Sequence, residues 1–392
     1  MCEDALIEPP RFSILQICPC YVGMDQETGG VANVVRQLCF ELPKLGYPVT
    51  LICGNRELGK IKNRPRYIQH SPMLDQYIIE QWVHPLLGPC FCFPNGRRDC
   101  NRNAVAHVHT CFSLFTESAM SDLVRRDVPF VFTPHGKLSP LMFGTRKWGK
   151  RIWWRLVAAK RIRMATRLVV LGEREAELFP QLGLGWNGDV VPNGYSAEEQ
   201  NGSQGSVPLM SGRYVLFLGY LEARKQPGFL LDVFAGSRLR QTHKLVLAGP
   251  DAYGYRANLE KKIKVLGLEK DVVFWGAVYG AAKWNLFAHA DCFCLPSLAE
   301  GMPVVLCEAI GAGIPVLYSK GCNFPEIARF GGGIELSEFE VNLWRMELER
   351  ICLDEKINQF MRRNMMEKRM NYTWSEICRK WVKVYQEAGG LL

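Results

Sequence analysis

The chain has 392 residues and a formal net charge of +9, with 48% hydrophobic and 22% charged residues. This composition is typical of a globular protein, and the length predicts two domains, because a single core seldom grows beyond about 250–300 residues. No run reaches the roughly 18 uncharged apolar residues of a membrane-spanning helix, and the opening MCEDALIEPPRF lacks the features of a signal or transit peptide. We therefore expect a soluble, cytoplasmic protein.

The first half alternates short apolar runs with helical segments. Continuous apolar strands separated by helices indicate an α/β sheet that is covered on both faces. Residues 33–46 predict a helix between the first two strands. Parallel strands are expected at residues 12–18, 48–53, 105–110, 129–135 and 167–172.

Fifteen cysteines are spread through these and later apolar runs. The C-x-C spacings of Cys18 with Cys20 and of Cys292 with Cys294 differ from the paired C-x-x-C of a zinc site, and no matching histidine cluster follows. We expect buried, reduced thiols and no bound metal.

Histidines occupy two of the expected strands. His135 ends the strand at 129–135, where α/β sheets place ligand-binding groups, although a lone histidine is more often a hydrogen-bonded core residue. His107 and His109 alternate along the strand at 105–110, so we expect one on each face and assign both a structural role.

Residues 137–167 carry a concentration of positive charge. No acid stands between Asp127 and Glu173, whereas ten Lys and Arg residues do, with Trp148, Trp153 and Trp154 interleaved. Two interpretations stay open: a solvated helical face, or a patch that meets anionic lipid headgroups. Nucleic acid is not expected as a partner, since no binding motif accompanies the charge.

The second half repeats the alternation after a linker. Residues 196–212 are rich in Asn, Gly, Ser and Gln and lack periodicity, which is typical of a linker. Residues 373–390 predict an amphipathic terminal helix that packs on the body. Strands are expected at 214–219, 244–249, 271–276, 292–297 and 315–319, with helices at 227–235 and 282–290. The pattern thus predicts two Rossmann-like halves.

The stretch EGMPVVLCE, residues 300–308, has a glutamate at each end of an apolar run. Pro303 suits the first turn of a helix that starts near Met302, because its missing N–H costs nothing there. Glu300 then lies in the loop before the helix and Glu308 on its second turn.

The free N–H groups of residues 301–304 lie between these carboxylates, and such a helix N-terminus attracts phosphate. The carboxylates can accept hydrogen bonds from hydroxyls on either side, which together describes a nucleotide sugar. The alternative is two glutamates that share no ligand.

The longer stretch EGMPVVLCEAIGAGIPV, residues 300–316, resembles EGFPLVVLEAMACGKPVV of glycosyltransferase family 4, retaining enzymes of GT-B fold. The resemblance extends over nearly the whole chain, to TGGVANVVRQL (28–38), TPHGKLSP (133–140), VVPNG (190–194) and GCNFPEI (321–327). The HGKLSP and GCNFPEI variants resemble members that build bacterial surface polysaccharides.

The resemblance implies an α/β fold of two Rossmann-like domains that face across a cleft, with the C-terminal helix packing back on the body. Residues 1–195 would bind the acceptor and 213–372 the donor. Residues 196–212 would link them, and residues 373–392 would form the terminal helix.

The resemblance also implies roles for matching positions. Glu300 would hold hydroxyls of the transferred sugar and Glu308 those of the ribose. Lys225, in FLGYLEARKQP, would neutralise the leaving diphosphate. The loop that offers its N–H groups to the diphosphate would be Gly301, Met302, Pro303 and Val304.

Two positions of the first half gain roles in the same way. Gly30 follows Thr28 and Gly29 in a turn that opens a helix, and glycine there lets the backbone approach a ligand closely, although a plain turn is the alternative. Within the family pattern Gly30 would face the diphosphate, and His135 would lie close to the donor sugar and the incoming acceptor.

The chain departs from the family's usual GRLxxxKG pattern. Tyr220 follows Gly219 in place of arginine, and Gln226 replaces the later glycine, so a second phosphate-binding cation is missing from its expected place. Arg224 could substitute for it, but we favour the interpretation of Arg224 as an ordinary exposed arginine. Without a substitute, the diphosphate would be held more weakly or activity would be lost.

Together, the motifs and the resemblance predict a metal-independent, retaining transferase without a cofactor, since no D-x-D motif suited to a divalent ion is present. Its partners would be a nucleotide sugar and a lipid-linked or glycan acceptor, with peripheral attachment to the inner face of a membrane through residues 137–167. The alternatives are a catalytically impaired sugar-nucleotide binding or scaffold protein and, less favoured, a nucleotide-sugar 2-epimerase.

Overall fold

The computed structural model describes residues 12–19, 29–53, 78–80, 104–139, 152–185, 188–201 and 212–390. The chain forms two compact units. The first comprises Met1–Pro192 together with Trp374–Leu392, and the second comprises Asn193–Thr373. Of the linker expected at 196–212, residues 197–201 form a helix and 202–211 lie outside the described residues.

The first unit is built on a parallel sheet of order β3-β2-β1-β4-β5-β6-β7. Its strands are β1 (Ser13–Cys18), β2 (Val49–Cys53), β3 (Ile78–Glu80), β4 (Ala104–His109), β5 (Phe130–Thr133), β6 (Arg167–Val170) and β7 (Asp189–Val190). All five strands expected here are confirmed. The short edge strands β3 and β7 were not predicted.

Helices cover both faces of this sheet. They are α1 (Gly30–Lys44), α2 (Leu114–Arg125), a short π-helix (Trp154–Ala158) that continues into α5 (Ala159–Ile162), α6 (Glu173–Ala176), α7 (Leu178–Gln181) and α16 (Trp374–Ala388). The face bearing Leu15, Ile17 and Val108 packs with α2 and α5 in one apolar cluster. The opposite face bears Gln16 and His107 and contacts α16 through Tyr385.

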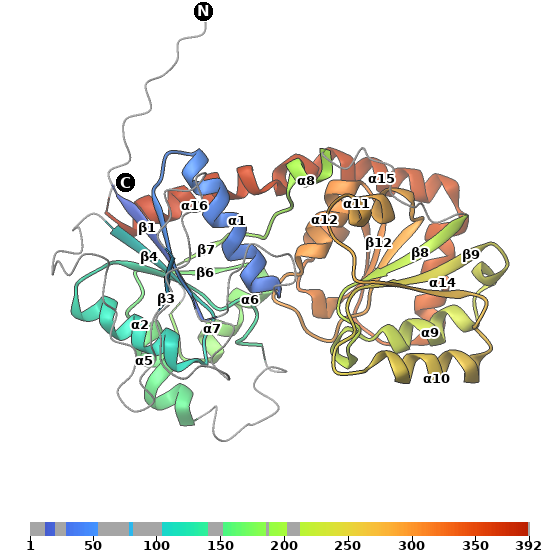
Figure 1. The fold of residues 1–392 in the computed structure, drawn as a ribbon, viewed down its shortest axis with the longest axis horizontal. Coiled ribbons are helices and arrows are strands. Elements are labelled where there is room, and N and C mark those ends of the chain that lie inside the picture. The colour runs from blue at the N-terminus through green and yellow to red at the C-terminus, as the bar shows by residue number, and fades with distance from the viewer. Residues whose placement is uncertain are drawn as a thin grey trace, which may run out of the picture. The chain divides into compact units, whose positions relative to one another are not determined.

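The last helix of the chain therefore belongs to the first unit. In Figure 1, α16 at the red end of the chain runs beside α1 at its blue end, and the two helices pack together. Trp381 and Tyr385 of α16 are buried, and both rings contact His107 of β4. The prediction that a terminal amphipathic helix packs on the body is confirmed.

The second unit repeats the pattern with the parallel order β10-β9-β8-β11-β12-β13. Its strands are β8 (Arg213–Leu218), β9 (His243–Ala248), β10 (Val272–Gly276), β11 (Cys292–Leu295), β12 (Val316–Ser319) and β13 (Gly333–Leu336). The first five match the expected strands. The edge strand β13 was not predicted.

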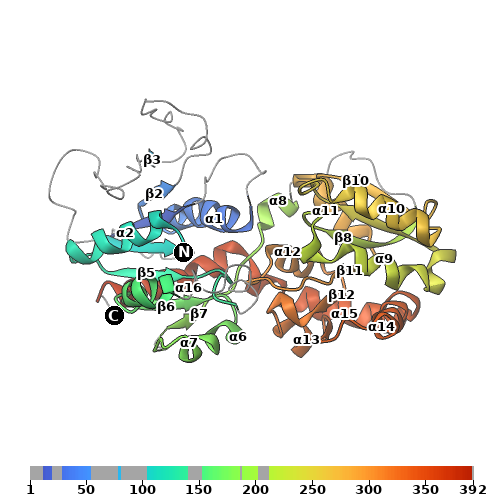
Figure 2. The same cartoon turned by 90° about the horizontal axis from the view of Figure 1, so that it is seen from below.

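Helices cover both faces of this sheet as well, with α9 and α10 packed together on one face and α11 and α12 on the other (Figure 1). Figure 2 shows β10, β8, β11 and β12 one after another in the order of the sheet. The helices of the unit are α8 (Ala197–Asn201), α9 (Pro227–Ala235), α10 (Arg256–Leu266), α11 (Gly280–His289), α12 (Val304–Ala312), α13 (Glu326–Arg329), α14 (Val341–Leu353) and α15 (Glu355–Lys368).

The cysteines whose side chains the structure describes are buried and form no disulfide, in agreement with the expectation of reduced thiols. They are Cys18, Cys39, Cys111, Cys292, Cys294, Cys307, Cys322, Cys352 and Cys378. In the described ranges no helix is both long enough and apolar enough to cross a bilayer.

Candidate functional site

The amino end of α12 in the second unit presents open backbone donors. The helix begins at Val304 with Pro303 as its N-cap, two residues later than expected, because Pro303 has an extended backbone (φ −72°, ψ 125°). No side chain caps it, and the amides of Gly301, Met302, Val304 and Val305 donate no hydrogen bond to any other described residue. Open amides and the helix dipole together suit an anionic group.

The loop before α12 is held by the neighbouring motif GCNFPEI. The amide of Glu300 donates to the carbonyl of Gly321 at 2.7 Å, and Asn323 Nδ2 donates to the carbonyl of Gly301 at 2.6 Å. A side chain at position 321 would not fit, because its Cβ would lie 2.4 Å from the Ser297 carbonyl oxygen. Gly321 therefore fixes the place of Glu300 at the entrance to the helix.

Glu300 lies at the centre of a cluster of charges. Its Oε1 atom is 2.7 Å from Lys225 Nζ and 2.8 Å from an Arg224 guanidinium nitrogen, and it accepts a hydrogen bond from Ser297 Oγ at 3.0 Å. The side chain of Lys225 is only 9% exposed, so the ion pair is largely shielded from water. The structure thus brings together residues separated by more than seventy positions in sequence.

These partners keep Glu300 ionised. Burial alone would raise the pKa of its carboxyl, but the charges of Lys225 and Arg224 and their hydrogen bonds outweigh burial and hold the pKa below its usual range. Glu300 is therefore an ionised carboxylate, whose oxygen atoms can accept hydrogen bonds from hydroxyl groups.

The interpretation of Arg224 as an ordinary exposed arginine is wrong. Its guanidinium pairs with Glu300 and, at 2.6 Å, with Glu222, and it also donates to the carbonyl of Ala299. The backbone carbonyl of Arg224 accepts from Leu298 N–H at 2.9 Å. Arg224 thus ties its own loop to the loop that carries Glu300.

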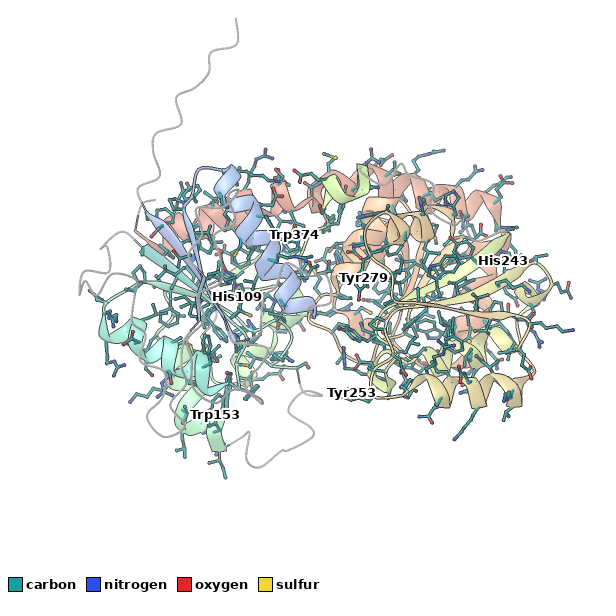
Figure 3. The ribbon with its side chains drawn as sticks, viewed as in Figure 1. His109, Trp153, His243, Tyr253, Tyr279 and Trp374 are labelled. Carbon is teal, nitrogen blue, oxygen red and sulfur yellow. The ribbon has the colours of Figure 1, made fainter. Side chains whose placement is uncertain are left out.

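Glu308 forms a second ion pair on the second turn of α12, as expected from its spacing. It is buried, and its Oε1 atom lies 2.8 Å from Nζ of Lys283, which comes from the first turns of α11. Lys283 was not predicted as a site residue, since nothing near it in sequence indicates Glu308. Lys283 lies four residues after Tyr279, the N-cap residue of α11, which Figure 3 labels.

The two departures from the family pattern have different surroundings. Tyr220 is exposed (38%) beside Gly219 in the loop after β8. Gln226 has a left-handed backbone (φ 55°, ψ 39°) and is the N-cap of α9. This conformation explains why glycine is usual at that position, because it costs glycine nothing and other residues some strain.

Gly30 and His135 belong to the first unit. Gly30 is the first residue of α1, exposed, and a Cβ added there would have open space around it. His135 does not end its strand as expected, because β5 stops at Thr133 and His135 has a left-handed backbone (φ 52°) in the following turn. Its side chain is 8% exposed and Nε2 lies 2.9 Å from Nδ1 of His109.

The prediction that His107 and His109 face opposite sides of the sheet is wrong. Residues two positions apart on a strand point to the same face, and the two rings lie with centroids 3.8 Å apart. Both side chains are completely buried. Figure 3 labels His109 within the sheet of the first unit.

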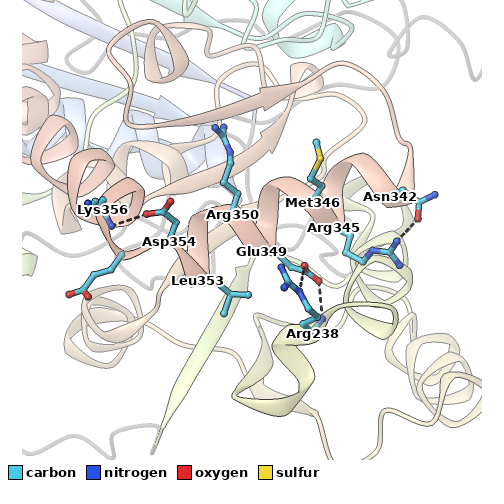
Figure 4. Close-up of a pocket in the computed structure, with 10 residues that line it drawn as sticks. Arg238, Asn342, Arg345, Met346, Glu349, Arg350, Leu353, Asp354 and Lys356 are labelled. Atoms are coloured by element: carbon cyan, nitrogen blue, oxygen red, sulfur yellow. Dashed lines mark hydrogen bonds and ion pairs between the residues drawn. The ribbon is translucent and has the colours of Figure 1, made fainter.

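A hollow of about 1060 Å³ in the second unit contains none of the predicted residues. It lies along α14, and most of its charged side chains bond to one another or to near neighbours (Figure 4). Glu349 pairs with Arg238 at 2.9 Å and also accepts from Ser237, while Arg345 donates to Asn342. These contacts stabilise the packing of α14, so we assign the hollow no role as a site.

Two family models match consecutive parts of the chain. "Glycosyltransferase Family 4" matches residues 28–199, and "Glycosyl transferases group 1" matches residues 203–370. The gap between them falls in the expected linker.

Characterised relatives are similar over parts of the chain. An α-1,4-N-acetyl-D-galactosaminyltransferase of Campylobacter jejuni that acts on a GalNAc-GalNAc-diNAcBac-PP-undecaprenol is 29% identical over 44% of this chain and 48% of its own length. A GDP-mannose:cellobiosyl-diphosphopolyprenol α-mannosyltransferase of Xanthomonas campestris is 22% identical over 67% of this chain and 68% of its own. The chain thus spans under half of the Campylobacter enzyme's length.

The fold is also that of known transferases. Sucrose-phosphate synthase of Thermosynechococcus elongatus superposes with a TM-score of 0.76 over 97% of this chain and 100% of that one, at 17% identity. With the two matched family models and two Rossmann-like units, the chain belongs to the glycosyltransferases of family 4 and has their GT-B fold.

Proposed function

We propose that this protein is a retaining, metal-independent glycosyltransferase that moves a sugar from a nucleoside-diphosphate sugar to a lipid-linked or glycan acceptor. The observation that carries the proposal is the ionised Glu300, held by Lys225 and Arg224 at the open amino end of α12. Glu308 on the second turn supplies a second carboxylate on the other side of those amides.

In this proposal the diphosphate binds the amides that precede and open α12. Lys225 turns from Glu300 toward the phosphate as negative charge develops, because an ammonium on a flexible stem can follow that charge. Glu300 then accepts hydrogen bonds from hydroxyls of the transferred sugar, and Glu308 from those of the ribose. Lysine, arginine and helix amides supply the positive charge that a divalent ion would otherwise provide.

The reaction proposed is a displacement on one face of the sugar. The bond from the anomeric carbon to the leaving phosphate oxygen breaks, and the acceptor hydroxyl bonds to that carbon on the same face. The hydroxyl proton passes to the leaving phosphate oxygen, so configuration is retained. Glu300 holds the oxocarbenium-like sugar in place during this step.

The nature of the acceptor is proposed from the relatives. The names of the Campylobacter and Xanthomonas enzymes specify polyprenyl diphosphate-linked glycans as acceptors. We extend to this chain the class of acceptor, a growing glycan on a lipid carrier.

The proposal is tested by incubating the protein with a panel of nucleoside-diphosphate sugars, with and without membrane lipid extract, and measuring nucleoside diphosphate release. We expect release by the wild type and a loss of about 10²-fold or more in Glu300→Gln, because the carboxylate would be lost. Glu349→Gln is the matched control, since this ion-paired glutamate lies on α14.

A catalytically impaired binding protein is the second candidate, and Tyr220 in place of the family's arginine favours it. Thermal shifts with UDP, GDP, ADP and dTDP separate the two candidates, because a bound ligand raises apparent stability. A shift without release from any donor would support the binding protein. Release that persists in Glu300→Gln would refute the proposed mechanism, and neither shift nor release would refute both candidates.

A further inference from the structure

Two cations of the second unit lie beside the same oxygen atom of Glu300. Nζ of Lys225 and a guanidinium nitrogen of Arg224 are 2.7 Å and 2.8 Å from its Oε1 atom. Glu222 pairs with Arg224 on the other side, so these four side chains together carry two positive and two negative charges. A diphosphate that binds nearby adds negative charge to this balanced set, and one of the two cations must answer it.

The guanidinium of Arg224 is held on several sides. Its Nη2 atom donates to Glu222 at 2.6 Å, and its Nη1 atom donates to the carbonyl of Ala299 at 2.7 Å in addition to its contact with Glu300. The backbone carbonyl of Arg224 accepts from Leu298 N–H at 2.9 Å. A guanidinium presents its donors in a rigid planar fork, so Arg224 cannot turn toward a ligand without breaking several of these bonds.

Lys225 is held in a different way. Among the described residues, Glu300 is the only one to which its ammonium donates a hydrogen bond. An ammonium on a flexible four-carbon stem can redirect its three donors by rotation about single bonds. Gly219 beside the stem has no side chain that would hinder this movement. Lys225 can therefore leave Glu300, whereas Arg224 is fixed beside it.

Glu300 needs one cation at all times. Its side chain is only 13% exposed, and burial by itself raises the pKa of its carboxyl. If Lys225 were the only counter-ion, its departure would leave a shielded carboxylate unpaired, which is unfavourable. The nearby thiol of Cys322 supplies no charge, because burial and the charge of Glu300 raise its pKa to about 12. Arg224 is therefore the group that keeps Glu300 ionised once Lys225 has turned away.

We propose that Arg224 is a positioning residue that stays paired with Glu300 throughout the reaction and thereby frees Lys225 to bind the leaving diphosphate. This inference rests on the proposed transferase function and gives the two neighbouring cations separate roles within it. Arg224 acts through Glu300 and does not bind the diphosphate itself. It therefore does not replace the arginine that the family has at the position of Tyr220.

A double-mutant cycle measures whether Arg224 acts through Glu300. Isothermal titration gives the Kd of whichever of UDP, GDP, ADP and dTDP shifts wild-type melting most. We expect Arg224→Gln to raise this Kd about tenfold, because Lys225 must then leave a carboxylate that has no other cation. In Glu300→Gln, where no counter-ion is needed, the same change should leave Kd within about twofold. Loss of the pair with Glu222 is common to both backgrounds and cancels.

Arg240→Gln is the matched control. Arg240 Nε lies 2.8 Å from Asp271 Oδ2, and the two side chains are 35% and 14% exposed. The corresponding exposures of Arg224 and Glu300 are 35% and 13%. Arg240 precedes β9, whereas the site follows β8 and β11, so the control lies at the opposite edge of this parallel sheet. We expect no change of Kd in Arg240→Gln.

A rescue experiment separates this role from a purely structural one. With the donor from the release assay, kcat should fall about tenfold in Arg224→Gln and recover largely in Arg224→Lys, because the proposal requires a charge beside Glu300. The loss in Arg224→Gln should be larger at about pH 6 than at about pH 8, since Glu300 without Arg224 takes up a proton at higher pH.

The contrary outcomes are distinct. An equal rise of Kd in both backgrounds would make Arg224 a direct diphosphate ligand, and an equal rise in Arg240→Gln would make net charge the cause. Equal, pH-independent losses of kcat in Arg224→Gln and Arg224→Lys would show a structural role. Each of these results overturns the inference and leaves the proposed function standing. A wild type that binds none of the four nucleoside diphosphates refutes the proposed function and this inference with it.

Discussion

The side chain of Lys225 can extend to Glu300 because the residue that lies beside it, at position 219, is a glycine. A Cβ at Gly219 would lie 3.0 Å from Cδ of Lys225, which is tighter than nearly all such contacts. The next residue, Tyr220, is exposed and occupies the place where the family has arginine. The loop therefore keeps the lysine that pairs with Glu300 and lacks the second cation.

Restoring that cation is expected to strengthen diphosphate binding. Tyr220→Arg should lower the Kd for the best-bound nucleoside diphosphate by about fivefold at low salt, as an exposed ion pair contributes at most about 1 kcal/mol. Isothermal titration at two salt concentrations measures the effect, which should shrink at high salt.

Phe360→Arg is the control for added charge. Phe360 is also an exposed aromatic residue, but it lies on α15. Equal changes in both variants would mean that net charge, and not the position of Tyr220, sets the affinity.

The sequence indicated those candidate site residues that lie together in one stretch or within a motif. Glu300 and Glu308 lie in one stretch, and Lys225 lies in a motif, so spacing and resemblance were sufficient. Lys283 could not be found in this way, because its partner Glu308 comes from another element of the chain. The error over His107 and His109 was avoidable, because strand periodicity alone places both on one face.

At the scale of elements, the turn after β5 depends on α6. Glu175 on this short helix is buried and accepts from the amides of Gly136 and Leu171. Burial raises the pKa of Glu175 from 4.5 to about 7, because its two hydrogen bonds compensate only partly for lost hydration. The turn that contains His135 is thus held by a hydrogen bond to a carboxyl group that titrates near neutrality.

This pKa makes a prediction about stability. Between about pH 4.5 and 7 the folded protein holds a proton that the unfolded chain releases, so the free energy of unfolding falls as pH rises through this range. The full effect is about 3 kcal/mol. In Glu175→Gln, which cannot ionise, urea unfolding at about pH 5 and pH 8 should show a smaller decrease.

Glu177→Gln provides the comparison, since Glu177 is an exposed glutamate two residues further on. It should retain the pH dependence of the wild type. If Glu175→Gln and the wild type lose the same free energy between the two pH values, the carboxyl of Glu175 does not titrate in this range.

Elements were predicted where they are long and apolar. The central strands β1, β4, β8 and β9 have six residues each, most of them buried, and their apolar runs are visible in the sequence itself. The edge strands β7 and β13 have two and four residues. Such segments become strands through pairing with a neighbour, so their own composition carries little signal. The start of α12 was misplaced because proline suits both the N-cap region and the first turn.

At the scale of the whole molecule, the described part of the basic segment exposes apolar side chains among positive charges. Ile152, Leu156 and Met164 are 54%, 72% and 54% exposed, and Arg155 and Lys160 are exposed nearby. The rest of the segment, residues 140–151, lies outside the described residues. This mixture is typical of surfaces that contact a membrane interface.

We predict that the protein sediments with vesicles containing anionic lipid at low salt and that Leu156→Asp reduces the bound fraction several-fold, because a charge replaces an inserted apolar side chain. Val265→Asp is the matched control, an aliphatic residue of α10 that is 85% exposed. If the wild type stays in the supernatant, the segment is a solvated surface.

The return of α16 to the first unit sets an order of events during synthesis. Trp381 and Tyr385 leave the ribosome after all of residues 193–373, yet they close the face of a sheet whose first strand begins at Ser13. The second unit has all of its strands and helices available before the first unit does. The first unit therefore cannot complete its fold until translation is nearly finished, and the polar face that holds His107 stays uncovered until then. During this interval the nascent chain is most in need of chaperones that prevent aggregation.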